Sequence, residues 1–207
     1  MVKPRITFVL LVLLAFVLVL NNSCGRSRPS RFYVLIPTVE AKASPAQGEG
    51  ESIDSISIGI GPVKFSDYLQ RPQILSQTKA NELEYAEYDR WAEPLDHNFA
   101  RVVAENLSNL VPAAHVFVFP WRGSAGVQYS VTFEVLRFSE GADGKVTLIV
   151  LWSIYDEEEI KLISRKKSTF THPGPRGDET YYQELAGIMS RMVEDLTREI
   201  AKELLGS

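Results

Sequence analysis

Apolar and polar residues alternate along several stretches of the chain. Within Ile53–Phe65, Ile56, Ile58 and Ile60 alternate with Ser and Gly residues, and Val127–Phe138 alternates in the same way before its phase slips by one residue. A period of two is typical of a strand with one buried face, and the slip predicts a β-bulge. Val146–Tyr155 is apolar on both faces, and Ile160–Phe170 returns after a charged turn. We therefore expect an antiparallel meander of three strands with Val146–Tyr155 in the central place.

Shorter apolar runs predict further strands. Phe32–Pro37 is a first strand that ends at its proline, and His115–Pro120 is another. Gln73–Thr78 and Glu82–Tyr88 are separated by three residues that suit a turn, so they are expected to form a hairpin.

Two stretches instead repeat their apolar residues every three or four positions, which is the spacing of an amphipathic helix. The first starts at Pro94, whose missing N–H costs nothing in a first turn, and continues to Leu110 before Pro112 ends it. The second covers Glu179–Leu205 and has Asp178 as its N-cap. Such a stripe usually packs into a core; for part of the second, the alternative is a partner surface. The predicted fold class is α+β, a mainly antiparallel sheet with two amphipathic helices packed on one face.

The chain begins with the pattern of a secretory signal. Two basic residues precede the apolar run Ile6–Leu20, and Ser23 precedes Cys24, the only cysteine. The run of about 15 residues is shorter than the roughly 20 that a membrane-spanning helix needs. We therefore interpret residues 1–23 as a signal peptide.

Cys24 stands where the lipobox of bacterial lipoproteins has its acylated cysteine. The small Ser23 fits this resemblance, whereas Asn21 occupies the position at which the lipobox usually has leucine. Lipid attachment at Cys24 would hold the protein to a membrane, because two or more acyl chains anchor stably. Gly25 is not the aspartate of an inner-membrane retention signal, so we predict the periplasmic face of the outer membrane. The alternatives are an ordinary cleaved signal and an uncleaved anchor helix.

The remaining chain is long enough for one domain of ordinary size. We expect a lipidated tether at 24–31 and a single α+β domain at 32–207, with a flexible loop at 38–52 that is rich in Ala, Gly, Pro, Ser and Glu. Without the two basic residues of the signal, 20 basic and 26 acidic residues leave a net charge of −6. This balance argues against a nucleic-acid partner, which normally requires a basic stripe.

Candidate chemistry is sparse. The three histidines lie far apart without the spacing of metal ligands. Gly59 and Gly61 are followed by a proline and lack the third glycine of a phosphate loop, so we interpret them as sites where neighbouring groups approach closely. Glu157–Glu159 are adjacent and diverge. We predict no catalytic residues, no metal and no cofactor.

Four segments occur in an order that carries a family resemblance: Phe32–Leu35, Ile58–Val63, Tyr68–Ile74 (YLQRPQI) and Arg90–Leu95 (RWAEPL). Together with the cysteine-terminated signal, they resemble the PqiC-like family of auxiliary lipoproteins of ABC-type transporters. The resemblance implies a non-enzymatic lipoprotein on the periplasmic face of the outer membrane. It also implies an MCE-domain periplasm-spanning partner and its ABC transporter, which move lipid between the two membranes.

The motif residues Tyr68, Arg71, Pro72, Arg90 and Trp91 are the candidate partner-binding residues. Tyrosine, arginine and tryptophan are favoured at interface hot spots.

The alternative is a packing role. In that case Trp91 fills the core, Arg71 pairs with a carboxylate such as Glu93, and Pro94 starts a helix.

We therefore expect a subunit of an intermembrane lipid-transport system that docks the tunnel component at the outer membrane. A ring-like homo-oligomer would suit such a dock. The alternative function is a periplasmic lipoprotein that regulates envelope or peptidoglycan assembly by binding an enzyme. A third is a carrier that holds lipid in its own apolar pocket.

Overall fold

The computed structural model describes residues 8, 28–40, 56–121, 126–158, 160–177 and 180–206. The predicted signal peptide apart from Phe8, the predicted lipid-attachment residue Cys24, most of the predicted loop 38–52 and the predicted N-cap Asp178 lie outside the described residues.

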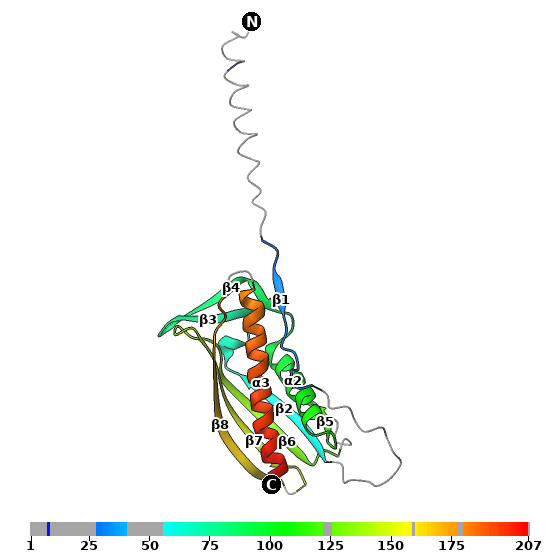
Figure 1. Cartoon of the computed structure of the whole chain (residues 1–207). Helices are drawn as coiled ribbons and strands as arrows, with labels where there is room; N and C mark the ends of the chain where they lie inside the picture. Colours follow the sequence, from blue (N-terminus) through cyan, green and yellow to red (C-terminus); the bar gives the residue numbers. More distant parts are fainter. Residues whose placement is uncertain are drawn as a thin grey trace.

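Eight strands form one sheet and two helices cover it (Figure 1). The strands are β1 (Arg31–Tyr33), β2 (Ser57–Phe65), β3 (Gln73–Lys79), β4 (Glu82–Trp91), β5 (His115–Val118), β6 (Tyr129–Glu140), β7 (Lys145–Asp156) and β8 (Lys161–Pro173). A 3-10 turn, η1 (Asp67–Leu69), follows β2, and the helices are α2 (Leu95–Leu110) and α3 (Tyr181–Gly206). The predicted fold class is confirmed.

The meander predicted from the alternating pattern forms the long side of the sheet. Strands β6, β7 and β8 pair antiparallel in that order, and the register between β6 and β7 shifts between Val135 and Arg137, where the phase slip predicted a bulge. On its other side β6 pairs in parallel with β2, and its pairing with β3 is short, with Ser76 opposite Glu140. The predicted hairpin is present as the antiparallel pair β3 and β4.

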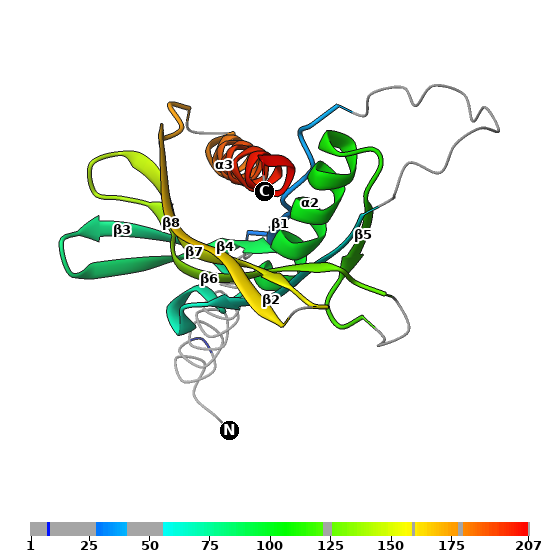
Figure 2. The same cartoon turned by 90° about the horizontal axis from the view of Figure 1, so that it is seen from below.

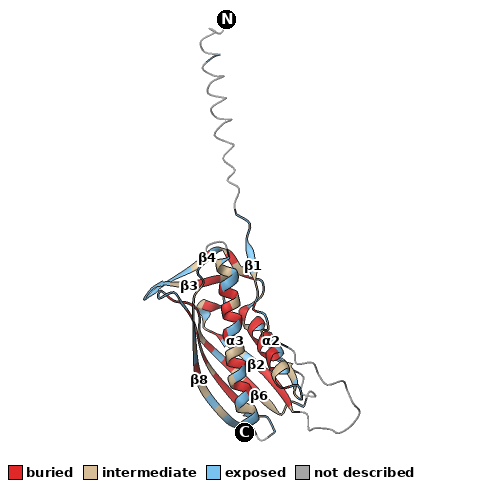
Figure 3. Ribbon diagram, in the orientation of Figure 1, coloured by how far each residue is buried: buried red, intermediate tan, exposed pale blue. Residues whose placement is uncertain are grey.

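Both helices lie on the same face of the curved sheet (Figure 2). The buried residues of helix and sheet meet between them (Figure 3). Phe99 of α2 is the centre of an aromatic cluster, with its ring centroid 5.7 Å from that of Phe65 and 5.6 Å from that of Phe133. The apolar stripe of α3 is buried as well, including Leu185, Met192 and other residues in its central turns. Both stripes are therefore core.

The glycines of β2 give room to aromatic side chains, as predicted. A Cβ atom at Gly59 would lie 2.7 Å from Cη2 of Trp121, and one at Gly61 would lie 2.9 Å from Cβ of Phe119. Gly61 also has a φ of +112°, a conformation that L residues rarely adopt. Any larger side chain would displace the ring or strain the strand.

The prediction of a strand over Phe32–Pro37 is wrong beyond Tyr33. Strand β1 has three residues, and the chain then passes in extended form along the two helices without pairing to a strand. The prediction that residues 38–52 have nothing to pack also fails at its start, because Val39 is buried. Side chains of the helices take the place of a neighbouring strand. The apolar pattern of the sequence cannot distinguish this arrangement from pairing within a sheet.

Candidate functional site

The two most distinctive motifs meet in space at one end of the sheet. Gln73 of β3 lies opposite Arg90 of β4, and the backbone N–H of Trp91 donates to the carbonyl oxygen of Pro72 at 2.7 Å. Strand β4 continues to Trp91, three positions past its predicted end, and this extension brings the motifs together.

Two of the predicted partner-binding residues support the structure from inside. Trp91 is 6% exposed and belongs to the hydrophobic core. The hydroxyl of the half-buried Tyr68 donates to the carbonyl oxygen of Leu136 at 2.6 Å, and the Tyr85 hydroxyl donates to the carbonyl oxygen of Tyr68 at 3.0 Å. For Trp91, the packing alternative describes its place in the fold.

Arg71 and Pro72 are exposed on the same end. The guanidinium of Arg71 lies 5.0 Å from the centroid of the Tyr85 ring, a cation–π distance. The alternative pairing of Arg71 with Glu93 is wrong, because Glu93 accepts a hydrogen bond from Arg101 at 2.5 Å. The exposed guanidinium rests on an aromatic face and keeps its donors directed to the surroundings.

Arg90 and Gln73 add an unusual feature beside this exposed pair. Nε of Arg90 and Oε1 of Gln73 are both buried, and neither has a hydrogen-bond partner among the described residues. Buried polar atoms are normally paired. Because both atoms are buried, this unpaired donor and acceptor lie beneath the surface of the motif end and are not open to a binding partner.

Strand β1 is fixed beside the motifs by one buried carboxylate. Asp89 is 6% exposed and accepts hydrogen bonds from Nε of Arg31 and from the Tyr33 hydroxyl, each at 2.8 Å. Burial, followed by the hydrogen bond to Asp89, raises the pKa of Tyr33 to about 12. Since Arg31 lies seven positions after Cys24, this cluster is where the predicted tether enters the fold.

Amide side chains on α2 hold the segment that follows β1. Oδ1 of Asn98 accepts from the Leu35 N–H at 2.6 Å and Nδ2 donates to the Leu35 carbonyl at 3.1 Å, which imitates a strand neighbour. About two helical turns further along α2, Oδ1 of Asn106 accepts from the N–H groups of Thr38 and Val39 at 3.1 and 3.2 Å. Asp89, Asn98 and Asn106 were not among the residues predicted from sequence. The available signal was two asparagines inside an apolar helical stripe, where polar groups must find partners.

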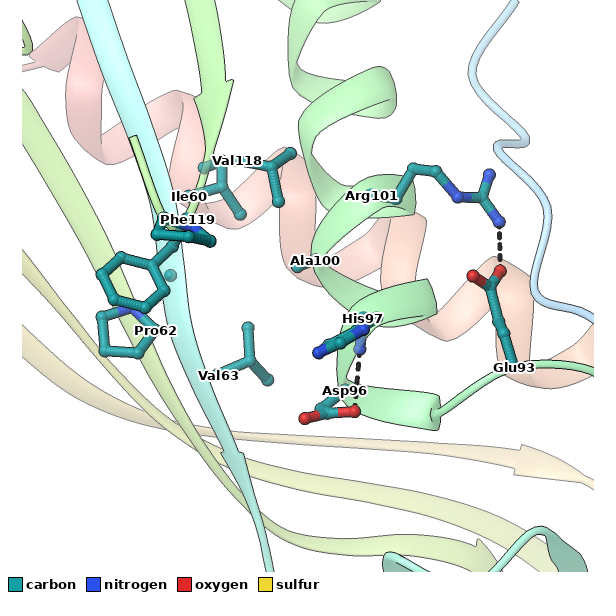
Figure 4. A pocket seen from close by; sticks show the side chains of 12 residues that line it. Ile60, Pro62, Val63, Glu93, Asp96, His97, Ala100, Arg101, Val118 and Phe119 are labelled. Atoms are coloured by element: carbon teal, nitrogen blue, oxygen red, sulfur yellow. Dashed lines mark hydrogen bonds and ion pairs between the residues drawn. The ribbon is translucent and has the colours of Figure 1, made fainter. Parts of the chain in front are cut away.

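An open pocket of about 570 Å³ lies between the first turns of α2 and the strands β2 and β5 (Figure 4). Its sheet side is apolar, with Pro62, Val63, Val118 and Phe119 among the lining side chains. Its helix side carries His97 and Ala100, with Asp96, Glu93 and Arg101 around them. Figure 4 shows His97 turned toward Val63, whereas Arg101 and Glu93 bind each other on the far side of the helix. Such a volume is within the usual range of ligand pockets.

Other chemical features are few in the part of the chain that is described. Within it, no three His, Cys, Asp or Glu side chains gather as metal ligands would. His97 and His115 are exposed, and Nε2 of His172 lies 2.9 Å from Oδ2 of Asp195 at a separate place. Among the described residues, no helix is long and apolar enough to cross a membrane.

Residues 33–201 match the sequence profile of a family described as the ABC-type transport auxiliary lipoprotein component. Intermembrane transport lipoprotein PqiC of Escherichia coli (strain K12) is 26% identical over 180 residues, which cover 86% of this chain and 91% of that protein. The protein of the same name from Shigella flexneri gives the same values.

Two solved structures share the fold. The crystal structure of an uncharacterized protein superposes with a TM-score of 0.69 at 19% identity, over 86% of this chain and 99% of that one. A Xanthomonas campestris protein superposes with a TM-score of 0.62 at 15% identity, over 84% and 96% of the two chains.

Proposed function

The chain belongs to the family of ABC-type transport auxiliary lipoprotein components, and from this premise we propose that it is a non-enzymatic subunit of an intermembrane lipid-transport system. The match over residues 33–201 is the observation that carries the proposal. The relatives that are 26% identical bear the name intermembrane transport lipoprotein and are covered over nearly their whole length.

We place the protein on the periplasmic face of the outer membrane, anchored by lipid on Cys24. Gly25 follows the cysteine in place of a retention aspartate, and the net charge of −6 without the signal gives the domain no general attraction to anionic lipids. The anchor is therefore the lipid itself.

The length of the tether places the motif end of the domain near the membrane. Arg31 stands seven positions after Cys24, and an extended chain spans at most 3.3–3.6 Å per residue, so the start of β1 would lie within about 25 Å of the proposed lipid. Phe32 of β1 pairs with Arg90 of β4. The motifs and the tether thus share one end of the molecule.

On this end, Arg71, Pro72 and Arg90 are the residues proposed to dock the MCE-domain component, while Tyr68 and Trp91 hold the strands from behind. The exposure of Arg71 and Pro72, beside the paired strands that carry the motifs, supports the proposal. Docking at this end would hold the terminus of a periplasmic tunnel next to the outer membrane.

In-cell crosslinking followed by pull-down tests the proposal. Wild type should recover an MCE-domain subunit, and both Cys24→Ala and Arg71→Glu should weaken that recovery. Lys79→Glu is the matched control, since it reverses another exposed charge on the same hairpin. Trp91 is unsuitable for this test because its substitution would disturb the core.

Recovery of a cell-wall enzyme with no MCE-domain subunit would overturn the transport proposal in favour of envelope regulation. Recovery of the subunit that Arg71→Glu leaves unchanged would place the docking surface elsewhere.

A further inference from the structure

Strand β5 is an edge of the sheet. It pairs with β2 alone, and Figure 2 shows it as the outermost strand on its side. The N–H groups of His115 and Phe119 donate to the carbonyl oxygens of Ile56 and Ile60 at 2.8 and 2.9 Å. Because backbone groups of successive strand residues point to opposite sides, those of Val116 and Val118 are directed away from β2. No described strand pairs with that side.

The open pocket begins where this edge ends. Val118 is 40% exposed and Phe119 is 51% exposed, and both line the pocket's sheet side. A strand laid along β5 would therefore place one of its side chains over the pocket, between Val118 and the α2 residue Ala100. Extended peptides bind to sheet edges in this way, with backbone bonds for affinity and a pocket for specificity.

The charge around the pocket selects the kind of segment. Arg101 is neutralised by Glu93. Oδ1 of Asp96 accepts from the backbone N–H of His97, and among the described residues no cationic side chain forms an ion pair with this carboxylate. The pocket thus combines an apolar side with a negative one. An extended segment complements it when an apolar residue and a basic residue stand two positions apart, because their side chains then share one face.

We propose that β5 and this pocket bind an extended segment of a partner protein, added as a further strand, with an apolar side chain in the pocket and a lysine or arginine at Asp96. An acyl chain could fill the pocket but could not use the outward backbone groups of Val116 and Val118. Residues 41–52 of the chain itself contain no apolar side chain larger than alanine or proline, so they offer nothing to fill it. The proposal does not depend on the transport function, because its test needs no transport component.

The test uses the mature protein in lipid nanodiscs and a synthetic peptide, acetyl-TKTVTKT-amide, in which the central valine and both lysines lie on one face of a strand. Two control peptides replace both lysines by glutamate or the central valine by proline. The amides of Val116 and Val118 should exchange rapidly with solvent in the free protein and slow about tenfold or more with the lysine peptide. The glutamate peptide should bind about fivefold more weakly, and the proline peptide should give no slowing.

Two variants separate the pocket from the edge. Asp96→Asn should bring the affinities for the lysine and glutamate peptides to within about twofold of each other, and both peptides should still bind. Phe119→Ser should weaken the binding of both peptides about tenfold. Leu205→Ser, the control, removes another exposed apolar side chain far along the sequence and should leave the affinity unchanged.

Slow exchange at Val116 and Val118 in the free protein would overturn the proposal, because the edge would already be covered. Slowing that grows with protein concentration in the absence of peptide would assign the edge to a second copy. Strand addition would also be excluded if the proline peptide slowed amide exchange as much as the lysine peptide. It would be excluded as well if no peptide slowed exchange while a titration with dodecyl maltoside perturbed the pocket residues.

Discussion

Asp89 shows how one side chain reinforces a short strand that buries few apolar atoms. A three-residue strand at a sheet edge buries few apolar atoms, and Phe32 within β1 is mostly exposed. The buried carboxylate joins Arg31 and Tyr33 to β4, and each charge-assisted bond is stronger than a neutral one. Asp89 therefore adds two side-chain hydrogen bonds to the backbone pairing of β1 with β4.

Replacing Asp89 with alanine should lower the free energy of unfolding by about 1–3 kcal/mol, because the Tyr33 hydroxyl loses its partner in a half-buried place. Urea denaturation followed by circular dichroism measures the change. Tyr33→Phe removes the same hydroxyl without leaving it unpaired and should cost less. An Asp89→Ala protein as stable as wild type would show that β1 is not held by this carboxylate.

The raised pKa of Tyr33 makes a further prediction about pH. The folded phenol stays protonated to about pH 12, whereas the unfolded one ionises near its ordinary value of 10.0. Between these values the unfolded state binds fewer protons, so unfolding becomes easier as pH rises through this window, and the stabilisation is fully present below it. Urea titrations from pH 9 to pH 12 should show a smaller fall for Tyr33→Phe than for wild type. Identical slopes would contradict the assignment.

At the scale of elements, α2 has two functions. Its apolar residues cover the sheet, and amide side chains within the same stripe serve as hydrogen-bond partners for an extended segment. Asn98 supplies both a donor and an acceptor to Leu35, so it satisfies backbone groups that a sheet would otherwise pair. A helix thus takes the place of a neighbouring strand.

Asn98→Ala should release this segment locally before the domain unfolds. Two buried backbone groups of Leu35 would lose their partners, at about 1–3 kcal/mol each. Residue-resolved amide exchange should show faster exchange at Leu35, while amides in the centre of β7 keep their protection. Asn109→Ala, which removes a single bond to the Val39 carbonyl at 3.0 Å, is the control and should have a smaller effect. Unchanged exchange at Leu35 would show that the clamp is dispensable.

For the whole molecule, the segment that follows the predicted tether, residues 31–39, packs as part of the domain. Leu35 is fully buried, and Ile36 donates its N–H to the Ser190 hydroxyl of α3 at 3.2 Å. The tether consequently continues through β1 into the space along both helices. If Cys24 carries the proposed lipid, a pull on that lipid would be transmitted to the core.

A chain that starts at residue 41 should therefore be less stable than one that starts at residue 28, by about 3 kcal/mol or more. The shorter chain loses the burial of Leu35 and leaves Asp89, Asn98 and Asn106 without their partners. Midpoints of urea denaturation for the two proteins give the comparison. Equal midpoints would mean that residues 28–40 contribute nothing to the fold.

The sequence by itself determined the elements of the domain, including the meander, its bulge, the β3–β4 hairpin and both helices. Those features depend on hydrophobic periods and on turn residues, which act over neighbouring positions. The family resemblance also came from sequence, through motifs that the profile over residues 33–201 confirms.

Only the tertiary structure decided which motif residues are buried and how the first segment is held. Trp91 enters the core, Arg71 lies on Tyr85 and not beside Glu93, and residues 34–39 bind helices instead of a strand. The contacts responsible join positions far apart, such as Leu35 with Asn98 at a separation of 63 and Ile36 with Ser190 at 154. Local patterns in the sequence do not reveal such pairings, because the two partners become neighbours only when the chain folds.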